Sequence, residues 1–501
     1  MGCAVYMIGL RYSIIEGKEV EFTMKDPSRP LIEALTQFKE ANPVSFHVPG
    51  HKGGILSGLP TELLTALQYD FTELEGLDDL HEPSGVIEEA QQRLSLLYGS
   101  DRSFFLVNGS TVGNLAMVYA ACSAGETVIV QRNAHKSIFH AIELSGAKPV
   151  FVSPVWDVST KTAGGVTALQ VSEAFKAYPM TKAVILTYPT YYGLTGNELE
   201  ETINLCHTYG VPVLVDEAHG AHFVVGEPFP RSALEMGADV VVHSAHKTLP
   251  AMTMASFLHV RSDFIAVEKV ARYLGMLQSS SPSYLLMASL DDARAYAESY
   301  NEEDKKHFEK QRTAFIKQLK LIQGLQPVET DDPLKLILRI EGYSGFDIQK
   351  KLEAEGIYSE IADPYQVLFV LPLLKVGLIY PFDEVYEKIK TAVARLDGLD
   401  KIISTEEAPP LGEGLSHLVY TFEEVANMEV EWIPYVDSVG RVAAASVIPY
   451  PPGIPLLIAG EIVKDEHVQT LEKLLRMGAK FQGDIRVNEK QIVVVQNRVE
   501  E

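Results

Sequence analysis

The chain has 501 residues, of which 46% are apolar and 22% charged, so two or three globular domains of a soluble class are expected. The 43 basic and 67 acidic residues give a formal net charge of −24, which argues against a nucleic-acid partner because an acidic surface repels phosphate backbones. The three cysteines are scattered and imply no disulfide framework, so a cytoplasmic protein is expected. No apolar run approaches the roughly 20 residues of a membrane span, so no membrane partner is expected.

The first 28 residues are predicted to form an N-terminal arm. Residues 1–23 do not read as a signal peptide. The chain begins Met-Gly-Cys, but Tyr6 stands where a myristoylation motif has Ser or Thr. Two interpretations remain open, namely a natural arm or a start assigned too early, with Met24 as the true first residue.

Helical spacing predicts helices over residues 29–42 and 86–98, with a glycine-rich loop at 47–54 between them. From residue 104 strands and helices alternate. Short apolar strands are predicted at 104–107, 127–131, 149–155, 183–188, 211–216, 238–246 and 256–260. Helices are predicted at 115–122, 136–145, 171–178 and 198–209. This alternation predicts an α/β fold with a mostly parallel sheet covered on both faces, and ligands bind such sheets at the carboxyl ends of the strands.

The rest of the chain predicts two smaller units after a major domain at 29–300. A long charged helix at 297–323 leads into a small α/β domain at 301–402. Its strands are expected at 334–340 and 365–373, and its helices at 346–356 and 383–396. A linker at 403–415 opens a C-terminal α+β domain at 403–501. There a strand is expected at 442–448, a turn at 449–453, a helix at 466–477 and a strand at 491–496.

Two charged residues lie at predicted strand ends. Lys247 follows the strand that begins at Ala238, and taken alone it could be a solvated surface lysine. Asp216 ends a very apolar strand, where a carboxylate needs a partner because burial next to a dry sheet is costly. A helix cap or an ion pair would explain Asp216, and so would the protonated pyridine nitrogen of pyridoxal 5′-phosphate (PLP), which acts as an electron sink.

Two further strand ends strengthen the cofactor interpretation. The small residues from Asn108 to Gly113 open a helix, where backbone N–H groups and hydroxyls can surround a phosphate, although Ser and Thr also simply cap helices. His135 follows the next strand and could stack on a pyridine ring, or be an ordinary loop histidine. A phosphate cradle, a pyridinium partner and a Schiff-base lysine together fit PLP better than any other cofactor.

Two other motifs suggest different functions. Residues 216–219 spell the DEAH box of helicases, but the chain has no P-loop and is strongly acidic, so a helicase is rejected. His219 with His222, and His243 with His246, form HxxH pairs that could bind a metal. Their spacing is not that of a standard zinc motif, so no metal is expected.

The sequence also resembles a known family, the fold-type I Orn/Lys/Arg decarboxylases, in the short bacterial form without an N-terminal wing domain. Matching stretches cover nearly the whole chain: FHVPGHKGG (46–54), GLDDLHEPSGVIEEAQ (76–91), FFLVNGSTVGNLAM (104–117), QRNAHKSIFHA (131–141), TYPTYYG (187–193), PVLVDEAHGAHF (212–223), HSAHKTLPAMT (243–253), SSSPSY (279–284) and PYPPGIPLLIAGE (449–461). One departure is Met254, where the family usually has glutamine shortly after its lysine. The resemblance implies an aspartate-aminotransferase-like PLP fold with a small domain and a C-terminal domain that borders the substrate entrance.

The resemblance also implies roles for individual residues. Lys247 would bind PLP covalently, Asp216 would pair with the pyridinium and His135 would stack on the ring. The remaining cofactor contacts would come from Gly109, Ser110, Thr111, Ala218, Ser244 and His246. Ser279 would reach the phosphate of a neighbouring subunit, since the family places its active sites at a homodimer interface.

The implied reaction is decarboxylation of arginine, lysine or ornithine, with arginine slightly favoured, to a polyamine or its precursor. Glu461 is the candidate for binding the distal cation of the substrate, with Asp78 and Asp79 in reserve. Two alternatives remain open. An aminotransferase could use Arg339 to bind the substrate carboxylate, whereas a decarboxylase places that carboxylate in an apolar site. A non-catalytic PLP-binding protein would not need the intact lysine and aspartate.

Overall fold

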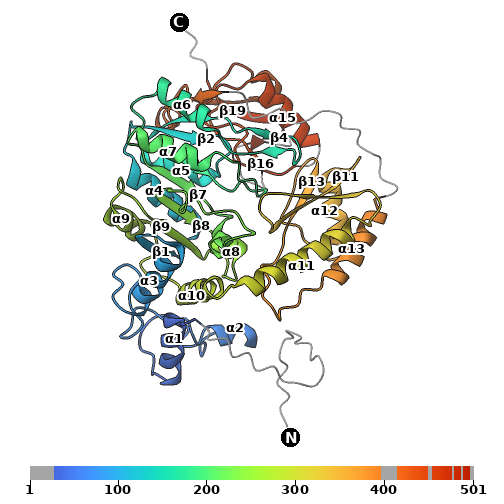
Figure 1. The fold of residues 1–501 in the computed structure, drawn as a ribbon. Coiled ribbons are helices and arrows are strands. Elements are labelled where there is room, and N and C mark those ends of the chain that lie inside the picture. The colour runs from blue at the N-terminus through green and yellow to red at the C-terminus, as the bar shows by residue number, and fades with distance from the viewer. Residues whose placement is uncertain are drawn as a thin grey trace.

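The computed structural model describes residues 27–396, 414–449, 454–476, 479–483, 485–486 and 489–496. Most of residues 1–28 and of the expected linker at 403–415, as well as the turn residues 450–453, lie outside the described residues. The largest element is an eight-stranded sheet at the centre of the molecule (Figure 1). Its strands, in spatial order, are β1 (Arg102–Leu106), β9 (Ser256–Val260), β8 (Val240–His243), β7 (Val213–Asp216), β6 (Ala183–Thr187), β2 (Thr127–Gln131), β3 (Lys148–Val152) and β14 (Leu415–His417).

The sheet is mostly parallel, as the sequence predicts. From β8 through β7, β6 and β2 to β3, each strand is parallel to its neighbour. β9 is antiparallel to both β8 and β1, and β14 is antiparallel to β3. The carboxyl ends of β7, β2 and β8 therefore lie along one edge, which places the residues after them close together.

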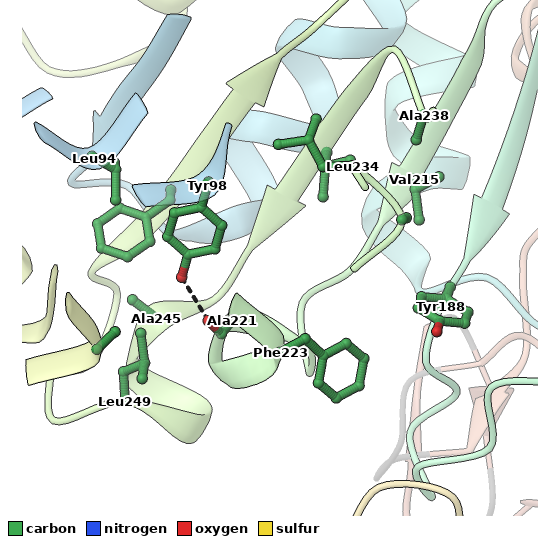
Figure 2. Packing of buried hydrophobic residues seen from close by; sticks show 14 of the residues in the cluster. Leu94, Tyr98, Tyr188, Val215, Ala221, Phe223, Leu234, Ala238, Ala245 and Leu249 are labelled. Atoms are coloured by element: carbon green, nitrogen blue, oxygen red, sulfur yellow. Dashed lines mark hydrogen bonds between the residues drawn. The ribbon is translucent and has the colours of Figure 1, made fainter. Parts of the chain in front are cut away.

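Both faces of this sheet are buried, because alternate residues of each strand point to opposite sides. In β7, Val213 and Val215 join one apolar cluster while Leu214 joins the other. Figure 2 shows residues of the first cluster, among them Leu94, Tyr98, Val215 and Leu234. The covering helices include α3 (Val86–Tyr98), α4 (Gly109–Ala121), α5 (Lys136–Ser145), α6 (Ala168–Ala177), α7 (Leu199–Thr208) and α9 (Val267–Leu277).

Helix α4 approaches the sheet closely at Gly113. A Cβ atom at this position would lie 2.8 Å from Leu106 Cδ1 and 2.9 Å from Val242 Cγ1. Only glycine permits this contact, and the contact sets the start of α4 at the carboxyl end of the sheet.

The small domain is a second sheet in the order β10 (Leu325–Glu329), β11 (Lys335–Ile340), β13 (Gln366–Val370) and β12 (Ile361–Ala362). Helices α12 (Gly345–Ala354) and α13 (Phe382–Ala394) pack with it around one apolar cluster. The single charged helix expected at 297–323 is instead two helices, α10 (Tyr284–Glu298) and α11 (Glu302–Leu319). Asn301 begins α11 by accepting hydrogen bonds from the backbone of Glu303 and Asp304, which separates the two helices.

The C-terminal domain has a three-stranded sheet in the order β15 (Val430–Pro434), β19 (Gln491–Val495) and β18 (Ile485–Arg486), with helix α15 (Asp465–Arg476). The strand expected at 442–448 is wrong, because this segment makes only isolated bridges before β16 (Ile448–Pro449) pairs with β17 (Phe481–Gln482). Strand β14, which was not predicted from the sequence, follows the expected linker and pairs with β3 of the major sheet. Within the described residues, the remaining elements are α1 (Pro30–Glu40), α2 (Thr61–Ala66), β4 (Trp156–Asp157), β5 (Thr162–Ala163), α8 (Ala245–Thr248), α14 (Phe422–Ala426) and the short 3₁₀ helices η1 (Ala221–Val225) and η2 (Tyr435–Asp437).

Candidate active site

Asp216 lies at the end of β7 with 3% of its surface exposed. One carboxylate oxygen accepts a hydrogen bond of 2.9 Å from the Asn114 side chain, and the other accepts one of 3.2 Å from the Ala218 backbone. Burial raises the pKa of Asp216, while Lys247 and Asn114 oppose this shift. Among the described residues no lysine or arginine forms an ion pair with this carboxylate, so a buried cation such as a pyridinium fits beside it.

His135 precedes α5 and is held in one orientation. Its Nδ1 accepts a hydrogen bond from the Ser137 backbone at 3.3 Å and lies 2.8 Å from the Ser137 hydroxyl. Burial, together with the charge of Lys247, lowers the pKa of His135 to about 3. The ring is therefore neutral near pH 7, with its proton on Nε2.

Asn114 connects these two residues, and the sequence analysis did not single it out. Its side-chain amide donates to Asp216 and also, at 2.8 Å, to the Ser137 hydroxyl. With 1% of its surface exposed, Asn114 orients both the acid and the histidine from one buried position. It lies one residue after the glycine-rich stretch 108–113, which is the signal that could have identified it.

Lys247 lies in α8, immediately after β8. Its Nζ is 3.0 Å from His219 Nε2 and 5.7 Å from the centre of the Tyr191 ring. Burial lowers the pKa of Lys247, and the carboxylates of Asp216 and Glu360 oppose the shift. A lysine with a lowered pKa has a larger fraction of free amine, which is the form that attacks an aldehyde.

The start of α4 forms a polar cradle beside Lys247. Asn108 does not cap this helix with its side chain, and the Ser244 hydroxyl donates to the Ser110 hydroxyl at 2.8 Å. Free N–H groups and hydroxyls at a helix start suit a phosphate. The cavity here is lined by Asn108, Gly109, Ser110, Thr111, His135, Tyr191, His219, Ser244, His246, Lys247, Thr253, Met254, Glu360 and Val370.

A second cavity shares Ser110, His135, Tyr191, His219 and Lys247 with the first. Asp216 and Ala218 also line it. Residues of all three domains line this cavity. They include Trp156 and Tyr192 of the major domain, Asp363 and Tyr365 of the small domain, and Pro449 and Leu456 of the C-terminal domain. A substrate bound at Lys247 would thus be enclosed by all three parts of the chain.

Glu461, the expected partner of the substrate cation, lies outside both cavities that contain Lys247. Its carboxylate is 2.9 Å from the Arg132 guanidinium, accepts a hydrogen bond from the Ile458 backbone and is 6% exposed. It lines a separate hollow that does not include Lys247. The contacts of Glu461 therefore do not support a role in binding substrate, because its charge is already compensated inside the protein.

Three other candidates also lie outside the two cavities. Asp78 accepts hydrogen bonds from several backbone N–H groups around the start of α3, which is a capping role, and Asp79 accepts one from the His81 backbone. Ser279 is exposed, and its N–H donates to the Asn108 side chain at 3.2 Å. Its contact with a neighbouring subunit's phosphate remains a prediction.

The residues that suggested the alternative functions form other contacts in the structure. Arg339 donates to the Gln366 side chain and to the Thr160 carbonyl, and it lines neither cavity with Lys247. His222 pairs with Asp332 at 2.9 Å, and His243 lies 3.4 Å from Glu217. In the described part of the chain, no group of three or more His, Cys, Asp or Glu side chains is arranged to hold a metal ion. Nor does any described helix have the length and apolar character to cross a membrane.

Four residues around Lys247 were not predicted from the sequence to belong to the site. His219 was considered only as part of a helicase-like or metal motif, and Lys335 only as one residue of an apolar strand. Tyr191 and Glu360 also line the cavity, and the Tyr191 hydroxyl donates to the Glu360 carboxylate. A polar residue soon after Asp216 was the available signal for His219. No local signal marked Lys335 or Glu360, which come from the small domain.

Comparison with known proteins agrees with this geometry. The family model "Orn/Lys/Arg decarboxylase, major domain" matches residues 29–330, and "Orn/Lys/Arg decarboxylase, C-terminal domain" matches residues 416–485. The uncharacterized protein YaaO of Bacillus subtilis is 46% identical over 93% of this chain and 98% of its own length. An arginine decarboxylase of Halalkalibacterium halodurans is 34% identical over 91% of this chain and 95% of its own. The solved constitutive lysine decarboxylase of Escherichia coli superposes with a TM-score of 0.74 at 20% identity, covering 94% of this chain and 82% of that one.

The fold and the cavity define a fold-type I PLP-dependent enzyme with a mostly parallel major sheet and a C-terminal domain. The chain belongs to the Orn/Lys/Arg decarboxylase family, and it is a PLP-dependent decarboxylase of a basic amino acid. The predictions of family, fold class, cofactor and reaction from the sequence are confirmed.

Proposed function

We propose that the substrate is arginine and the product agmatine, a polyamine precursor. The observation that carries this choice is the 34% identity, over 91% of this chain, to a relative named as an arginine decarboxylase. That relative has nearly the same extent, because 95% of its length is covered.

The cavity residues support specific roles. Lys247 would hold PLP covalently, Asp216 would face its ring nitrogen, and His135 would lie on the ring. The phosphate would bind at Gly109, Ser110, Thr111, Ser244 and His246. When bound, PLP supplies an electron sink for the pair released as CO₂ leaves. The neutral His135 and the buried Asp216 orient the ring, and the enclosing domains exclude water from the substrate carboxylate.

Glu360 is the carboxylate best placed to receive the distal cation of the substrate. It lines the first cavity, together with Lys247 and the polar cradle at the start of α4, accepts a hydrogen bond from Tyr191 and is exposed. Asp363 lines the neighbouring cavity, but it is enclosed by hydrogen bonds from Tyr192 and from the Tyr365 backbone. A guanidinium can therefore reach Glu360 without breaking a buried network.

The substrate is tested with purified, PLP-saturated protein incubated separately with arginine, lysine and ornithine. Mass spectrometry measures the amine and CO₂, with Lys247→Ala as the control. Agmatine that disappears in the control supports the proposal. Cadaverine or putrescine without agmatine would assign another substrate of the same family, and no CO₂ from any of the three would refute decarboxylation of these amino acids.

Glu360→Gln tests the cation site, with Asp363→Asn as the matched control. A charge-assisted hydrogen bond contributes about 1.5–3 kcal/mol, so KM for arginine should rise roughly tenfold or more in Glu360→Gln while kcat changes less. An unchanged KM in Glu360→Gln would exclude this residue from substrate binding.

A homodimer with active sites at the subunit interface is also part of the proposal. The loop that contains residues 46–54 and its flanks expose Val44, Phe46, Val48, Ile55 and Leu56, whose exposed fractions are 82%, 95%, 63%, 85% and 73%. Such a concentration of exposed apolar side chains is typical of a surface that another chain covers. The buried free thiols of Cys122 and Cys206 fit a location in the cytoplasm.

A further inference from the structure

A second lysine reaches the active site from the small domain. Lys335 begins β11, is completely buried, and its Nζ is 2.9 Å from His219 Nδ1. On the other side of the same imidazole, Lys247 Nζ is 3.0 Å from Nε2. His219 thus joins the two lysines, with one ring nitrogen for each.

The fold makes specific room for Lys335. Gly193 has a φ of +85° and packs against this side chain, and a Cβ there would lie 2.6 Å from Lys335 Cγ and 2.8 Å from Thr330 Oγ1. Asp332 lies three residues before Lys335 and is also completely buried. The Asp332 backbone N–H donates to the Gly193 carbonyl at 3.0 Å, which fixes the loop that carries the lysine.

The hydrogen-bonding capacity of the imidazole limits the protonation states that Lys247, His219 and Lys335 can adopt together. A neutral imidazole has one N–H donor and one acceptor, whereas a lysine ammonium can only donate. Burial and the two lysines lower the pKa of His219 well below its usual value, so the ring is neutral. With one ring nitrogen acting as a donor, the lysine facing it must be a free amine, and both lysines cannot be charged at once.

The surroundings indicate which lysine keeps its proton. Several charged or titratable groups face the trio, and they come from each part of the chain that packs against it: Asp216, His135, His246, Asp332 and Glu360. Among the carboxylates, Asp332 raises the pKa of Lys335 most. Its Oδ2 is buried without a hydrogen-bond partner among the described residues. Burial lowers the pKa of Lys335 to about 8, so it remains largely charged at pH 7. Among the carboxylates, Asp216 has the largest effect on the pKa of Lys247, but its two oxygens already accept hydrogen bonds from Asn114 and from the Ala218 backbone.

We propose that Lys335 is a positioning residue that donates from its ammonium to His219 Nδ1, so that His219 Nε2–H donates to Lys247 and keeps its amine unprotonated. The inference rests on the proposed role of Lys247 as the cofactor lysine. Through one imidazole, the small domain thereby sets the reactivity of a residue on the major domain. A positive charge on Lys335 also disfavours a second one on Lys247, so the two effects have the same sign.

The test measures the free-amine fraction of Lys247 directly. The full-length protein without PLP is treated with a trace of acetic anhydride, which acetylates only unprotonated amines, between pH 6 and 10. Peptide mass spectrometry then gives the acetylation of Lys247 at each pH. Lys335→Met removes the charge and the donor, and His219→Phe removes the bridge. Lys388→Met, on the outer face of α13 and paired with Glu384 at 2.7 Å, is the control.

In Lys335→Met the acetylation midpoint of Lys247 should rise by about one pH unit, which is roughly a tenfold loss of labelling at neutral pH. His219→Phe should shift the midpoint in the same direction, and the double variant should shift it by less than the sum of the two single shifts, because part of the effect of Lys335 passes through His219. The Lys388→Met control should keep the wild-type profile. Unshifted profiles in both single variants, or fully additive shifts in the double variant, would overturn the proposal.

A separate measurement keeps this result distinct from the cofactor assignment. Borohydride reduction of the PLP-loaded wild-type protein, followed by peptide mapping, identifies the lysine that holds PLP. Trapping on Lys247 with unshifted acetylation profiles refutes only the role of Lys335. Trapping on another lysine refutes the assignment of Lys247, and with it the inference.

Discussion

Replacing Arg132 by methionine should destabilise the C-terminal domain strongly. Arg132 lies just after β2, and its guanidinium donates to the carbonyls of Pro455 and Leu456 at 2.8 and 3.2 Å. It also pairs with Glu461 at 2.9 Å, and the two side chains are only 5% and 8% exposed. Removing one partner of such a pair leaves an uncompensated buried charge, which costs about 3–5 kcal/mol.

A surface pair of the same length provides the control. Arg231 and Glu200 are also 2.9 Å apart, but their side chains are 55% and 51% exposed. Arg231→Met should therefore cost no more than about 1 kcal/mol. The double variant Arg132→Met/Glu461→Met should recover much of the lost stability, because it leaves no buried charge without a partner.

The chain contains two tryptophans, which simplifies the assay. Trp432 lies in β15 of the C-terminal domain, and in a Trp156→Phe background it reports the unfolding of that domain alone. Urea titration followed by Trp432 fluorescence then gives the change in the free energy of unfolding. Equal losses in Arg132→Met and Arg231→Met would refute the reasoning. A Glu461→Gln variant with unchanged stability and a raised KM for arginine would restore the role in substrate binding predicted from the sequence.

Three further predictions concern the cofactor site and the interface. Asn114→Leu should weaken PLP affinity by about 1.5–3 kcal/mol, because Asp216 loses its charge-assisted hydrogen bond, and a fluorescence titration with PLP would measure this; an unchanged Kd would contradict it. The pKa of His135, lowered to about 3, predicts that its ring stays neutral from pH 5 to 9, and an NMR titration showing a transition near pH 6.5 would contradict this. Phe46→Asp should shift the protein towards monomer in analytical ultracentrifugation, whereas an unchanged sedimentation coefficient would argue against an interface at this loop.

The residues proposed to hold the cofactor could be grouped from the sequence, because they lie at the ends of strands of one parallel sheet. Lys247, Asp216 and His135 each lie at or shortly after the end of a predicted strand, and the topology brings those strand ends together. The residues proposed to set the reactivity of Lys247 and to bind the substrate cation are harder to predict. Lys335 and Glu360 come from a different sheet, and their positions depend on how two domains pack, for which the sequence carries no periodic signal.

Two other features were hard to predict from the sequence for the same physical reason. The segment 442–448 is apolar enough to predict a strand, but its backbone is divided among isolated bridges to three separate segments. Glu461 follows a glycine-rich stretch that resembles a functional loop, and only the structure reveals the buried arginine from β2 that compensates its charge. Pairing between distant segments decided both outcomes, and local sequence does not encode it.

The position of β14 has a consequence for how the chain can be divided. β3 would be the last strand of the major sheet if Leu415–His417 did not pair with Val150, Phe151 and Val152. An uncovered edge strand offers unpaired N–H and C=O groups to other molecules and promotes aggregation. A fragment that ends before residue 414 would therefore contain every proposed PLP contact and still be prone to self-association, so the C-terminal segment serves the solubility of the major domain as well as the enclosure of its substrate.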